Sequence, residues 1–241
     1  LIVLAAGDGK RLKSMDPKPY CKVNNRTLLE HSLSSFKGFK NIKKTIIVYN
    51  KKHKVLIKKL KLKNTVNIVG GKTRKESVFK ALKFIKKNKC KKVIIHDAAR
   101  PNISKEIIKK TISALKKNHA VIPVIKINDS IKTTNRNLIT NTAIREKFRL
   151  AQTPQGFNYK KLYELHLKYS SDLLDDDSAL FTKNNEKVFL INGSKDNLKI
   201  TTSNDLKTFK QLNFEKIFYG IGFDVHRLVK GKKLFLGGIK I

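Results

Sequence analysis

Cysteine and long apolar runs are nearly absent from this 241-residue chain. Cys21 and Cys90 are its only cysteines, too few for a disulfide framework or a zinc knuckle, so we expect two inert thiols and a cytoplasmic protein. No run reaches about 18 apolar residues, which excludes a transmembrane helix. No secretory leader is visible. The chain begins at Leu1, inside an apolar run and without methionine, so we expect its natural start to lie upstream.

Acidic residues are also scarce. Eighteen acidic residues stand against 54 basic ones, which gives a formal net charge of +36. Eight of the basic residues are arginine and 46 are lysine, and the lysines are spread over nearly every predicted helix and loop. Nucleic-acid-binding proteins cluster basic and aromatic residues on one face, so we do not expect nucleic acid as the main partner. The scattered lysines indicate a coding sequence rich in A/T codons. The net positive charge should attract anionic substrates in general.

Apolar residues make up 40% of the chain, enough to bury a sizeable core. Short β-type runs are predicted at 1–6, 45–49, 66–69, 93–96, 120–127, 188–191 and 198–200. Helices, with apolar residues three and four positions apart, are predicted at 26–36, 52–62, 76–87, 104–117, 159–169, 176–183 and 203–213. This alternation predicts an α/β fold with a mainly parallel sheet covered on both faces.

Two segments depart from this alternation. Residues 126–145 read as two extended polar pieces around a turn, which predicts a β-arm that packs on something else, such as another subunit. Residues 216–225 and 233–241 are extended and apolar, but a tail of about 25 residues is too short for a core. We therefore expect one domain at 1–214 and, at 215–241, a β-hairpin that begins a second, truncated domain.

The first chemical motif joins a strand to a glycine-containing loop. It reads LAAGDGKRL at 4–12, followed by PKPY at 17–20. Glycines let backbone N–H groups approach phosphate oxygens, and Arg11 and Lys18 add cationic donors. The loop is neither a Walker A sequence nor a complete dinucleotide fingerprint. The arginine and the Pro-Lys pair make it a stronger signal than Gly-x-Gly alone.

Four further motifs follow in order: GGKTRKESV at 70–78, HDAARP at 96–101, AQTPQ at 151–155 and DNLKIT at 196–201. With the first, they resemble the 2-C-methyl-D-erythritol 4-phosphate cytidylyltransferase family of non-mevalonate isoprenoid biosynthesis. The resemblance implies a Rossmann-like nucleotidyltransferase fold with a protruding β-arm. It also implies transfer of CMP from CTP to methylerythritol phosphate with release of pyrophosphate. The alternatives are a ribitol-phosphate cytidylyltransferase and, more remotely, a basic nucleic-acid-binding protein.

The resemblance also implies roles for single residues. Those expected at the nucleotide are Ala5, Ala6, Gly7, Gly9, Gly71, Arg74, Ser77, Asp97 and Ala98. Arg11, Lys18 and Lys199 would be the catalytic cations. Asp97 ends a predicted strand and would coordinate Mg²⁺ that bridges the phosphates. Methylerythritol phosphate would contact Ser130, Arg145, Thr153 and Lys199, and the arm of a homodimer partner would supply the first two of these.

Other positions remain less defined. Arg100 fits a structural role as well as a functional one, and Lys72 is given no role. Ile144 stands where relatives carry an aspartate that supports the neighbouring arginine. The acidic run at 175–177 is expected to place charge at a helix N-terminus, and His166 to be a surface or core residue.

The tail carries a separate motif. GIGFDVH at 220–226 and LGGI at 236–239 resemble the start of 2-C-methyl-D-erythritol 2,4-cyclodiphosphate synthase. In that family an Asp-x-His pair binds a divalent metal, usually zinc, which assigns Asp224 and His226 as metal ligands. Catalytic zinc takes three protein ligands, and the third would lie beyond Ile241. The sequence therefore predicts part of a bifunctional fusion, without the lyase activity of its second enzyme.

Overall fold

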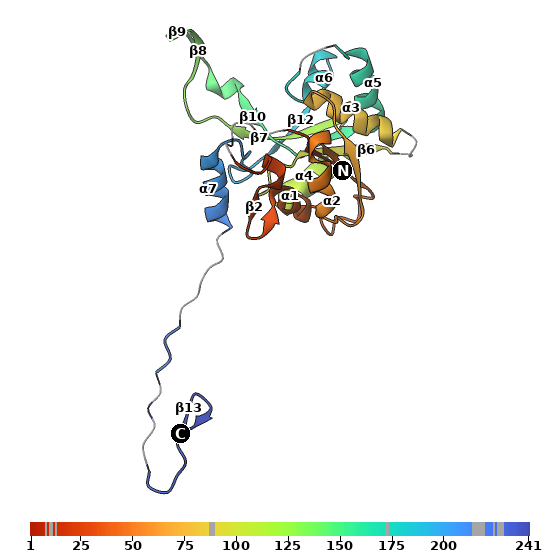
Figure 1. Cartoon of the computed structure of the whole chain (residues 1–241). Helices are drawn as coiled ribbons and strands as arrows, with labels where there is room; N and C mark the ends of the chain where they lie inside the picture. The colour runs from red at the N-terminus through yellow and green to blue at the C-terminus, as the bar shows by residue number, and fades with distance from the viewer. Residues whose placement is uncertain are drawn as a thin grey trace.

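The chain folds around one eight-stranded sheet with helices on both faces (Figure 1). The computed structural model describes residues 1–7, 9, 12, 14–86, 90–171, 174–213, 220–223, 225 and 229–241. The strands run in the order β10 (Arg149–Ala151), β7 (Ala120–Lys126), β11 (Gln155–Asn158), β6 (Lys92–Asp97), β1 (Ile2–Ala5), β4 (Thr45–Tyr49) and β5 (Thr65–Val69), with β12 (Phe189–Asn192) also paired to β7. The predicted α/β class is confirmed.

Most strand pairs are parallel, as expected. β1 lies parallel between β4 and β6, β5 extends the sheet beyond β4, and β12 joins β7 in parallel. β11 is inserted antiparallel between β6 and β7, and β10 runs antiparallel to β7. The sequence does not predict β10 and β11, because each has only three or four residues and Pro154 and Gly156 interrupt the apolar pattern.

Alternating strand side chains face two helical layers. The helices are α1 (Leu28–Ser35), α2 (Lys54–Lys59), α3 (Arg74–Ile85), α4 (Lys105–Ala114), α5 (Tyr159–Lys168), α6 (Ser178–Lys183) and α7 (Ser203–Leu212). Ile2 and Ile46 pack against α3, α5 and α6. Val3 and Ile47 face the opposite layer of α1 and α2, and α4 extends that layer over β6 and β7. Both faces of the sheet are therefore covered.

Capping side chains determine where the helices begin. α1 starts at Leu28, later than predicted, because Thr27 and Glu30 form a capping box. Ser104 caps α4 as predicted, with its hydroxyl accepting from the Ile107 N–H at 3.3 Å. Among the described residues, complete 3₁₀ turns lie at Lys18–Tyr20, Lys51–His53 and Arg145–Lys147.

The last helix of the sheet domain packs against the beginning of the chain. Phe209 of α7 lies in one buried cluster with Leu12 of the glycine loop and with Ile200. The Asn24 side chain, in the turn between β2 (Lys22–Val23) and β3 (Arg26–Thr27), donates to the Asn213 carbonyl at 2.7 Å. α7 thereby anchors the segment that carries the first chemical motif.

The prediction of a strand at 198–200 is wrong. These residues are irregular in the structure. Ile200 is fully buried and its N–H donates to the Ala99 carbonyl at 2.8 Å. This segment is held by one backbone hydrogen bond and one buried side chain, and not by the hydrogen-bond ladder of a sheet. Its apolar residues therefore resemble a strand in the sequence without forming one.

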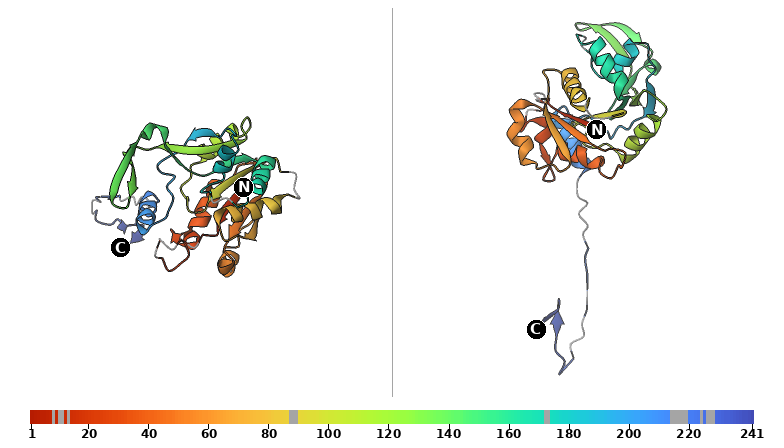
Figure 2. Two further views of the ribbon diagram at one scale, coloured as in Figure 1. Left: turned by 90° about the horizontal axis from the view of Figure 1, so that it is seen from above. Right: turned by 90° about the vertical axis from the view of Figure 1, so that its right-hand side faces the viewer.

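The predicted arm is a β-hairpin that projects from the sheet (Figures 1 and 2). β8 (Ile131–Asn135) and β9 (Leu138–Ala143) pair with each other between β7 and β10. Leu138 is 74% exposed and Ile139 65% exposed. The hairpin thus presents apolar side chains that no other described part of this chain covers.

The C-terminal tail contains another hairpin, of β13 (Phe235–Leu236) and β14 (Ile239–Lys240), so both strands lie inside the run predicted at 233–241, and the described residues of 216–225 form no strand. It lies apart from the main sheet in both figures (Figures 1 and 2). The predicted boundary near residue 214 falls within 214–219, outside the described residues. Within the part of the chain that the structure describes, no helix is long and apolar enough to cross a membrane.

Candidate active site

A cavity of about 360 Å³ opens at the carboxyl edge of the parallel strands. Open α/β sheets bind ligands at this edge. The residues that line the cavity follow β1, β5 and β6 or belong to the segment before α7: Leu4, Ala6, Gly7, Gly9, Lys18, Pro19, Gly71, Lys72, Thr73, Arg74, Ser77, Asp97, Ala99 and Lys199. Four of the five motifs therefore meet here. Ala5 and Ala98, also predicted at the nucleotide, are buried in the core and do not line the cavity.

Gly9 brings the loop after β1 against Lys18. Its φ is +68°, and a Cβ at this position would lie 2.5 Å from Lys18 Cβ. A residue with a side chain would have to move the loop, so glycine is required by this close approach. Gly7, Gly9 and Lys18 all line the cavity, as expected of a phosphate cradle. Arg11, predicted beside them, lies outside the described residues.

Gly71 and Ser77 shape the wall between β5 and α3. Ser77 Oγ accepts from the Gly71 N–H at 3.0 Å and donates to the Thr73 carbonyl at 2.8 Å. Thr73 in turn caps α3, since its hydroxyl accepts from the Glu76 N–H at 3.0 Å. The Ser77 hydroxyl therefore closes this loop in addition to facing the cavity, and its contact with the base stays a prediction.

We predict that Gly71→Ala destabilises the protein. An added Cβ would lie 2.3 Å from Glu76 Cβ, so the loop would have to shift. The free energy of unfolding should fall by about 1–3 kcal/mol, the usual cost of overpacking. Urea unfolding measures this. Gly7→Ala is the control for stability, because its Cβ would meet nothing within 4 Å. Equal stability of the two variants would contradict the prediction.

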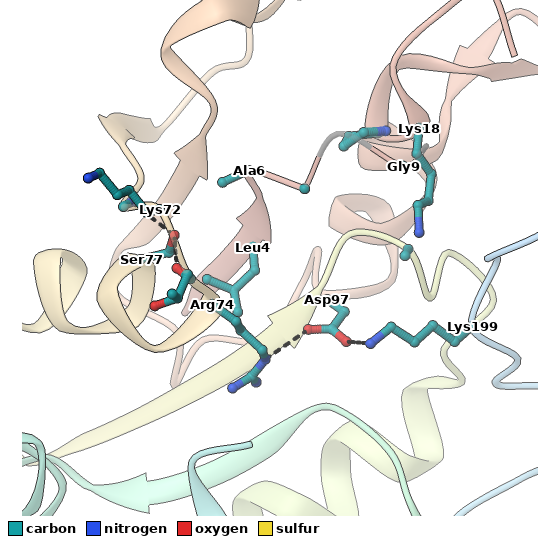
Figure 3. A pocket seen from close by; sticks show the side chains of 14 residues that line it. Leu4, Ala6, Gly9, Lys18, Lys72, Arg74, Ser77, Asp97 and Lys199 are labelled. Carbon is teal, nitrogen blue, oxygen red and sulfur yellow. Dashed lines mark hydrogen bonds and ion pairs between the residues drawn. The ribbon is translucent and has the colours of Figure 1, made fainter. Parts of the chain in front are cut away.

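Asp97 lies between two cations from distant segments (Figure 3). Arg74 Nε is 3.7 Å from Oδ1, and Lys199 Nζ is 3.0 Å from Oδ2. Burial raises the pKa of Asp97, but Arg74 and Lys199 more than offset this and hold the pKa at about 2. The carboxylate is therefore ionised at neutral pH.

The carboxylate of Asp97 suits a metal that arrives with its substrate. Among the described residues, no group of three or more His, Cys, Asp or Glu side chains could hold a metal ion. Mg²⁺ commonly binds through one or two carboxylates together with substrate phosphates and water. Asp97, on the wall of this cavity, fits that pattern. Asp224 and His226 lie outside the described residues.

Thr153 fixes Asp97 from behind. Its Oγ1 accepts from the Asp97 N–H at 3.1 Å and lies 3.0 Å from His96 Nδ1. His96 Nε2 lies 3.1 Å from the Arg100 carbonyl, to which it donates. Burial lowers the pKa of His96 to about 4, so the ring is neutral and its Nδ1 accepts from the Thr153 hydroxyl. The predicted contact of Thr153 with substrate stays a prediction.

Arg100 has a structural role. Its NH1 donates to the Asn197 carbonyl at 2.7 Å, and its NH2 to the Ala151 carbonyl at 3.3 Å. The Asn197 amide donates to Gln152 Oε1 at 3.2 Å. These bonds connect β10 with the segment that presents Lys199, so they determine where Lys199 enters the cavity.

Ser130 and Arg145 do not line the cavity. Ser130 is exposed near the base of the arm. Arg145 NH1 donates to the Asn128 carbonyl at 2.6 Å, and its Nε is 3.1 Å from Glu146 Oε1. Within one chain, two of the four residues predicted for methylerythritol phosphate are thus separated from the residues predicted for the nucleotide, whereas Lys199 lines the cavity.

Several residues that line or support the site have no role predicted from the sequence. Lys72 and Thr73 line the cavity beside Gly71. They belong to the motif at 70–78, so their position in that motif was the signal that could have identified them. Asp177 is buried and forms an ion pair with Arg74, with Arg74 NH1 2.6 Å from Asp177 Oδ2. The acidic run was expected only to place charge at a helix N-terminus. Asp176 does so, because its Oδ1 accepts from the Ala179 N–H at 3.1 Å.

Comparison with known proteins identifies relatives of the whole sheet domain. The family model described as 2-C-methyl-D-erythritol 4-phosphate cytidylyltransferase matches residues 1–212. The enzyme of that name from Wigglesworthia glossinidia brevipalpis is 39% identical over 211 residues, covering 86% of this chain and 91% of the relative. A crystal structure of 4-diphosphocytidyl-2C-methyl-D-erythritol synthase from Anaerococcus prevotii matches with a TM-score of 0.77 at 34% identity, covering 88% of this chain and 93% of that one.

Bifunctional relatives match the full chain. The bifunctional enzyme IspD/IspF of Pelagibacter ubique is 49% identical over 240 residues, covering 100% of this chain. The structure of the bifunctional IspDF from Campylobacter jejuni matches with a TM-score of 0.74 at 30% identity, again over 100% of this chain. This chain spans 63% of the length of the Pelagibacter protein and 62% of the Campylobacter chain.

Proposed function

The chain belongs to the 2-C-methyl-D-erythritol 4-phosphate cytidylyltransferase family, and on that premise we propose that it transfers CMP from CTP to 2-C-methyl-D-erythritol 4-phosphate. The products are 4-diphosphocytidyl-2-C-methyl-D-erythritol and pyrophosphate. One observation carries the proposal: a glycine loop, Lys18 and the Arg74–Asp97–Lys199 ion pairs surround a single cavity at the carboxyl edge of the sheet.

The proposed reaction needs positioning and charge stabilisation more than proton transfer. A phosphate oxygen of methylerythritol phosphate attacks the α-phosphorus of CTP, and the bond from that phosphorus to the bridging oxygen of the β-phosphate breaks. The electron pair of that bond leaves with pyrophosphate. Since the nucleophile is already an anion, no general base is required. Lys18 and Lys199 line the cavity, and their charges would offset the charge that accumulates on the crowded phosphorus.

The glycine loop and the α3 wall would hold the nucleotide. Gly7 and Gly9 would offer backbone N–H groups to the triphosphate, and Gly71, Arg74 and Ser77, which line the same cavity, would contact the base and ribose. Asp97 would hold Mg²⁺ together with the phosphates, and that ion would offset phosphate charge when bound. On this assignment Lys199 is shared between Asp97 and the incoming methylerythritol phosphate.

The proposed enzyme is a homodimer in which each arm completes the partner's site. Ser130 and Arg145 lie away from the cavity of their own chain, and the arm exposes Leu138 and Ile139. A partner that covers these side chains would bring a hydroxyl and a guanidinium to the neighbouring phosphate site. Sedimentation should therefore show a dimer, whereas an active monomer at micromolar concentration would contradict this assembly.

A pyrophosphate-release assay tests the function. With CTP and Mg²⁺, methylerythritol phosphate should be turned over much faster than ribitol phosphate, glycerol phosphate or erythritol phosphate. ATP, GTP and UTP in place of CTP control for the base. Preference for ribitol phosphate, or no pyrophosphate release with any member of the panel, would refute the proposed substrate.

We predict that the residues after Asn213 are dispensable for this activity. All residues assigned to the reaction precede Thr201, and α7 ends at Leu212. A chain that ends at Asn213 should keep kcat within about twofold, because no contact to the reacting groups is removed. It should also be more soluble, since the tail exposes Ile221 and Phe223. Loss of CTP turnover would show that the tail belongs to the sheet domain.

The tail itself should hold zinc weakly. Asp224 and His226 supply two of the three protein ligands that catalytic zinc normally takes. We propose that they serve a cyclodiphosphate-synthase-like domain in the longer protein. Metal analysis of the purified 241-residue chain should therefore find less than stoichiometric zinc, and one tightly held zinc ion per chain would contradict this assignment.

A further inference from the structure

Asp177 is a buried carboxylate behind the cavity. It lies directly before α6, is 2% exposed and does not line the cavity. Its Oδ2 is 2.6 Å from Arg74 NH1, and its Oδ1 is 2.9 Å from His166 Nε2. Burial raises the pKa of Asp177, but Arg74 and His166 lower it below its usual value, so the group is ionised. Both oxygens are thus engaged by helices α3 and α5.

Arg74 bridges two carboxylates through different nitrogens. NH1 contacts Asp177, whereas Nε lies 3.7 Å from Asp97 on the cavity wall (Figure 3). The guanidinium is a rigid planar fork, so fixing NH1 also fixes the direction of Nε. Its NH2 is buried and has no hydrogen-bond partner in the described part of the chain. Without Asp177, only the longer contact to Asp97 would orient the group.

His166 supports Asp177 from the side away from the cavity. Its ring is buried and stacks on Phe79 of α3, with centroids 5.6 Å apart and planes 2° apart. Packing between α3 and α5 therefore fixes the ring and directs Nε2 at the carboxylate. Arg74 and Phe79 belong to the same helix, so α3 contacts both ends of the Arg74–Asp177–His166 arrangement.

We propose that Asp177 is a positioning residue for Arg74, holding its guanidinium at the cavity wall in the orientation that binds the nucleotide. The inference rests on the proposed CTP site. A buried ion pair is weak evidence for stability, because desolvation offsets much of the attraction. Here the pair fixes one direction of a side chain that lines the cavity, while Asp177 itself stays out of reach of any ligand there.

Asp177→Asn tests this role, because it removes the charge and keeps the shape. The Michaelis constant for CTP should rise about tenfold while kcat changes less than about threefold, the signature of lost ground-state binding. Asp175→Asn is the matched control, since it removes the same charge from an exposed residue two positions away. The Asp175→Asn enzyme should keep the wild-type kcat and the wild-type Michaelis constant for CTP.

A double-mutant cycle separates positioning from a general structural role. If Asp177 acts through Arg74, then Asp177→Asn should change the CTP dissociation constant less than about twofold in an Arg74→Ala background. Calorimetric titration with CTP gives this constant even for inactive variants. An equal loss of affinity in both backgrounds, or wild-type CTP affinity in Asp177→Asn itself, would overturn the proposal.

A second variant covers the case in which Asp177→Asn does not fold. His166→Ala leaves the Arg74 pair in place but removes its support, so the CTP dissociation constant should rise about threefold, again only when Arg74 is present. No rise would overturn the proposal. Failure of the proposed function is distinct, because the wild-type chain would then neither bind CTP nor release pyrophosphate.

Discussion

Lys18→Ala should lower kcat for CTP-dependent pyrophosphate release by about 100- to 1000-fold, the usual cost of removing one charge-stabilising contact from a transition state. Lys18 lines the cavity, and Gly9 has no side chain that would separate the glycine loop from it. Because the contact strengthens as charge builds on the α-phosphorus, kcat should fall more than affinity for CTP.

Lys22→Ala is the matched control for this variant. Lys22 is an exposed lysine of β2, four positions further along the chain. It should retain wild-type kcat, which separates a local role of Lys18 from loss of one positive charge among the 54 basic residues. A Lys18→Ala enzyme with wild-type kcat would refute the assignment of the catalytic cation.

Arg145→Ala should also abolish most activity, and mixing it with Lys18→Ala should restore part of it. If each arm completes the partner's site, a mixed dimer contains one site with both native residues. Random exchange of subunits in a twofold dimer would then make about a quarter of all sites native. Pyrophosphate release should rise toward that fraction after co-refolding or co-expression, although each variant alone is nearly inactive.

Two results would contradict this exchange. Activity that stays at the level of the single variants would place Arg145 in its own chain's site or outside any site. Similar loss from Arg136→Ala, an arginine in the turn of the same arm, would indicate that the arm needs its charge generally. The expected outcome is that Arg136→Ala keeps near-native activity.

The sequence predicts the strands and helices whose apolar residues recur over several turns or alternations. The bounds of β4 agree residue for residue, and α5 differs by a single residue. β10 and β11 escape prediction because they are very short and their sheet positions depend on partner residues 23 to 66 positions away in the sequence. The strand predicted at 198–200 fails for the opposite reason, since Ile200 is buried by a cluster and not by a sheet.

The sequence motifs locate the residues that line the cavity, but they do not identify the residues that hold those side chains in place. Gly9, Arg74 and Asp97 stand in recognisable stretches, so their meeting at the carboxyl edge follows from strand order. Asp177 is 103 positions from Arg74, and nothing local in the sequence shows that the two touch. The same holds for Arg100 and Asn197, whose contact became visible only in the folded chain.

The packing of Phe209 on Leu12 joins a residue made at the start of synthesis to one made near its end. Leu12 follows Gly7 and Gly9 of the cavity and leaves the ribosome early, whereas Phe209 is made near the end of the sheet domain. Domains generally fold as units once their contacts are available. The glycine loop therefore gains its apolar anchor only after nearly the whole domain has emerged. If the cavity holds CTP as proposed, its glycine wall lacks this anchor until α7 has docked, so we expect tight CTP binding only from the completed sheet domain.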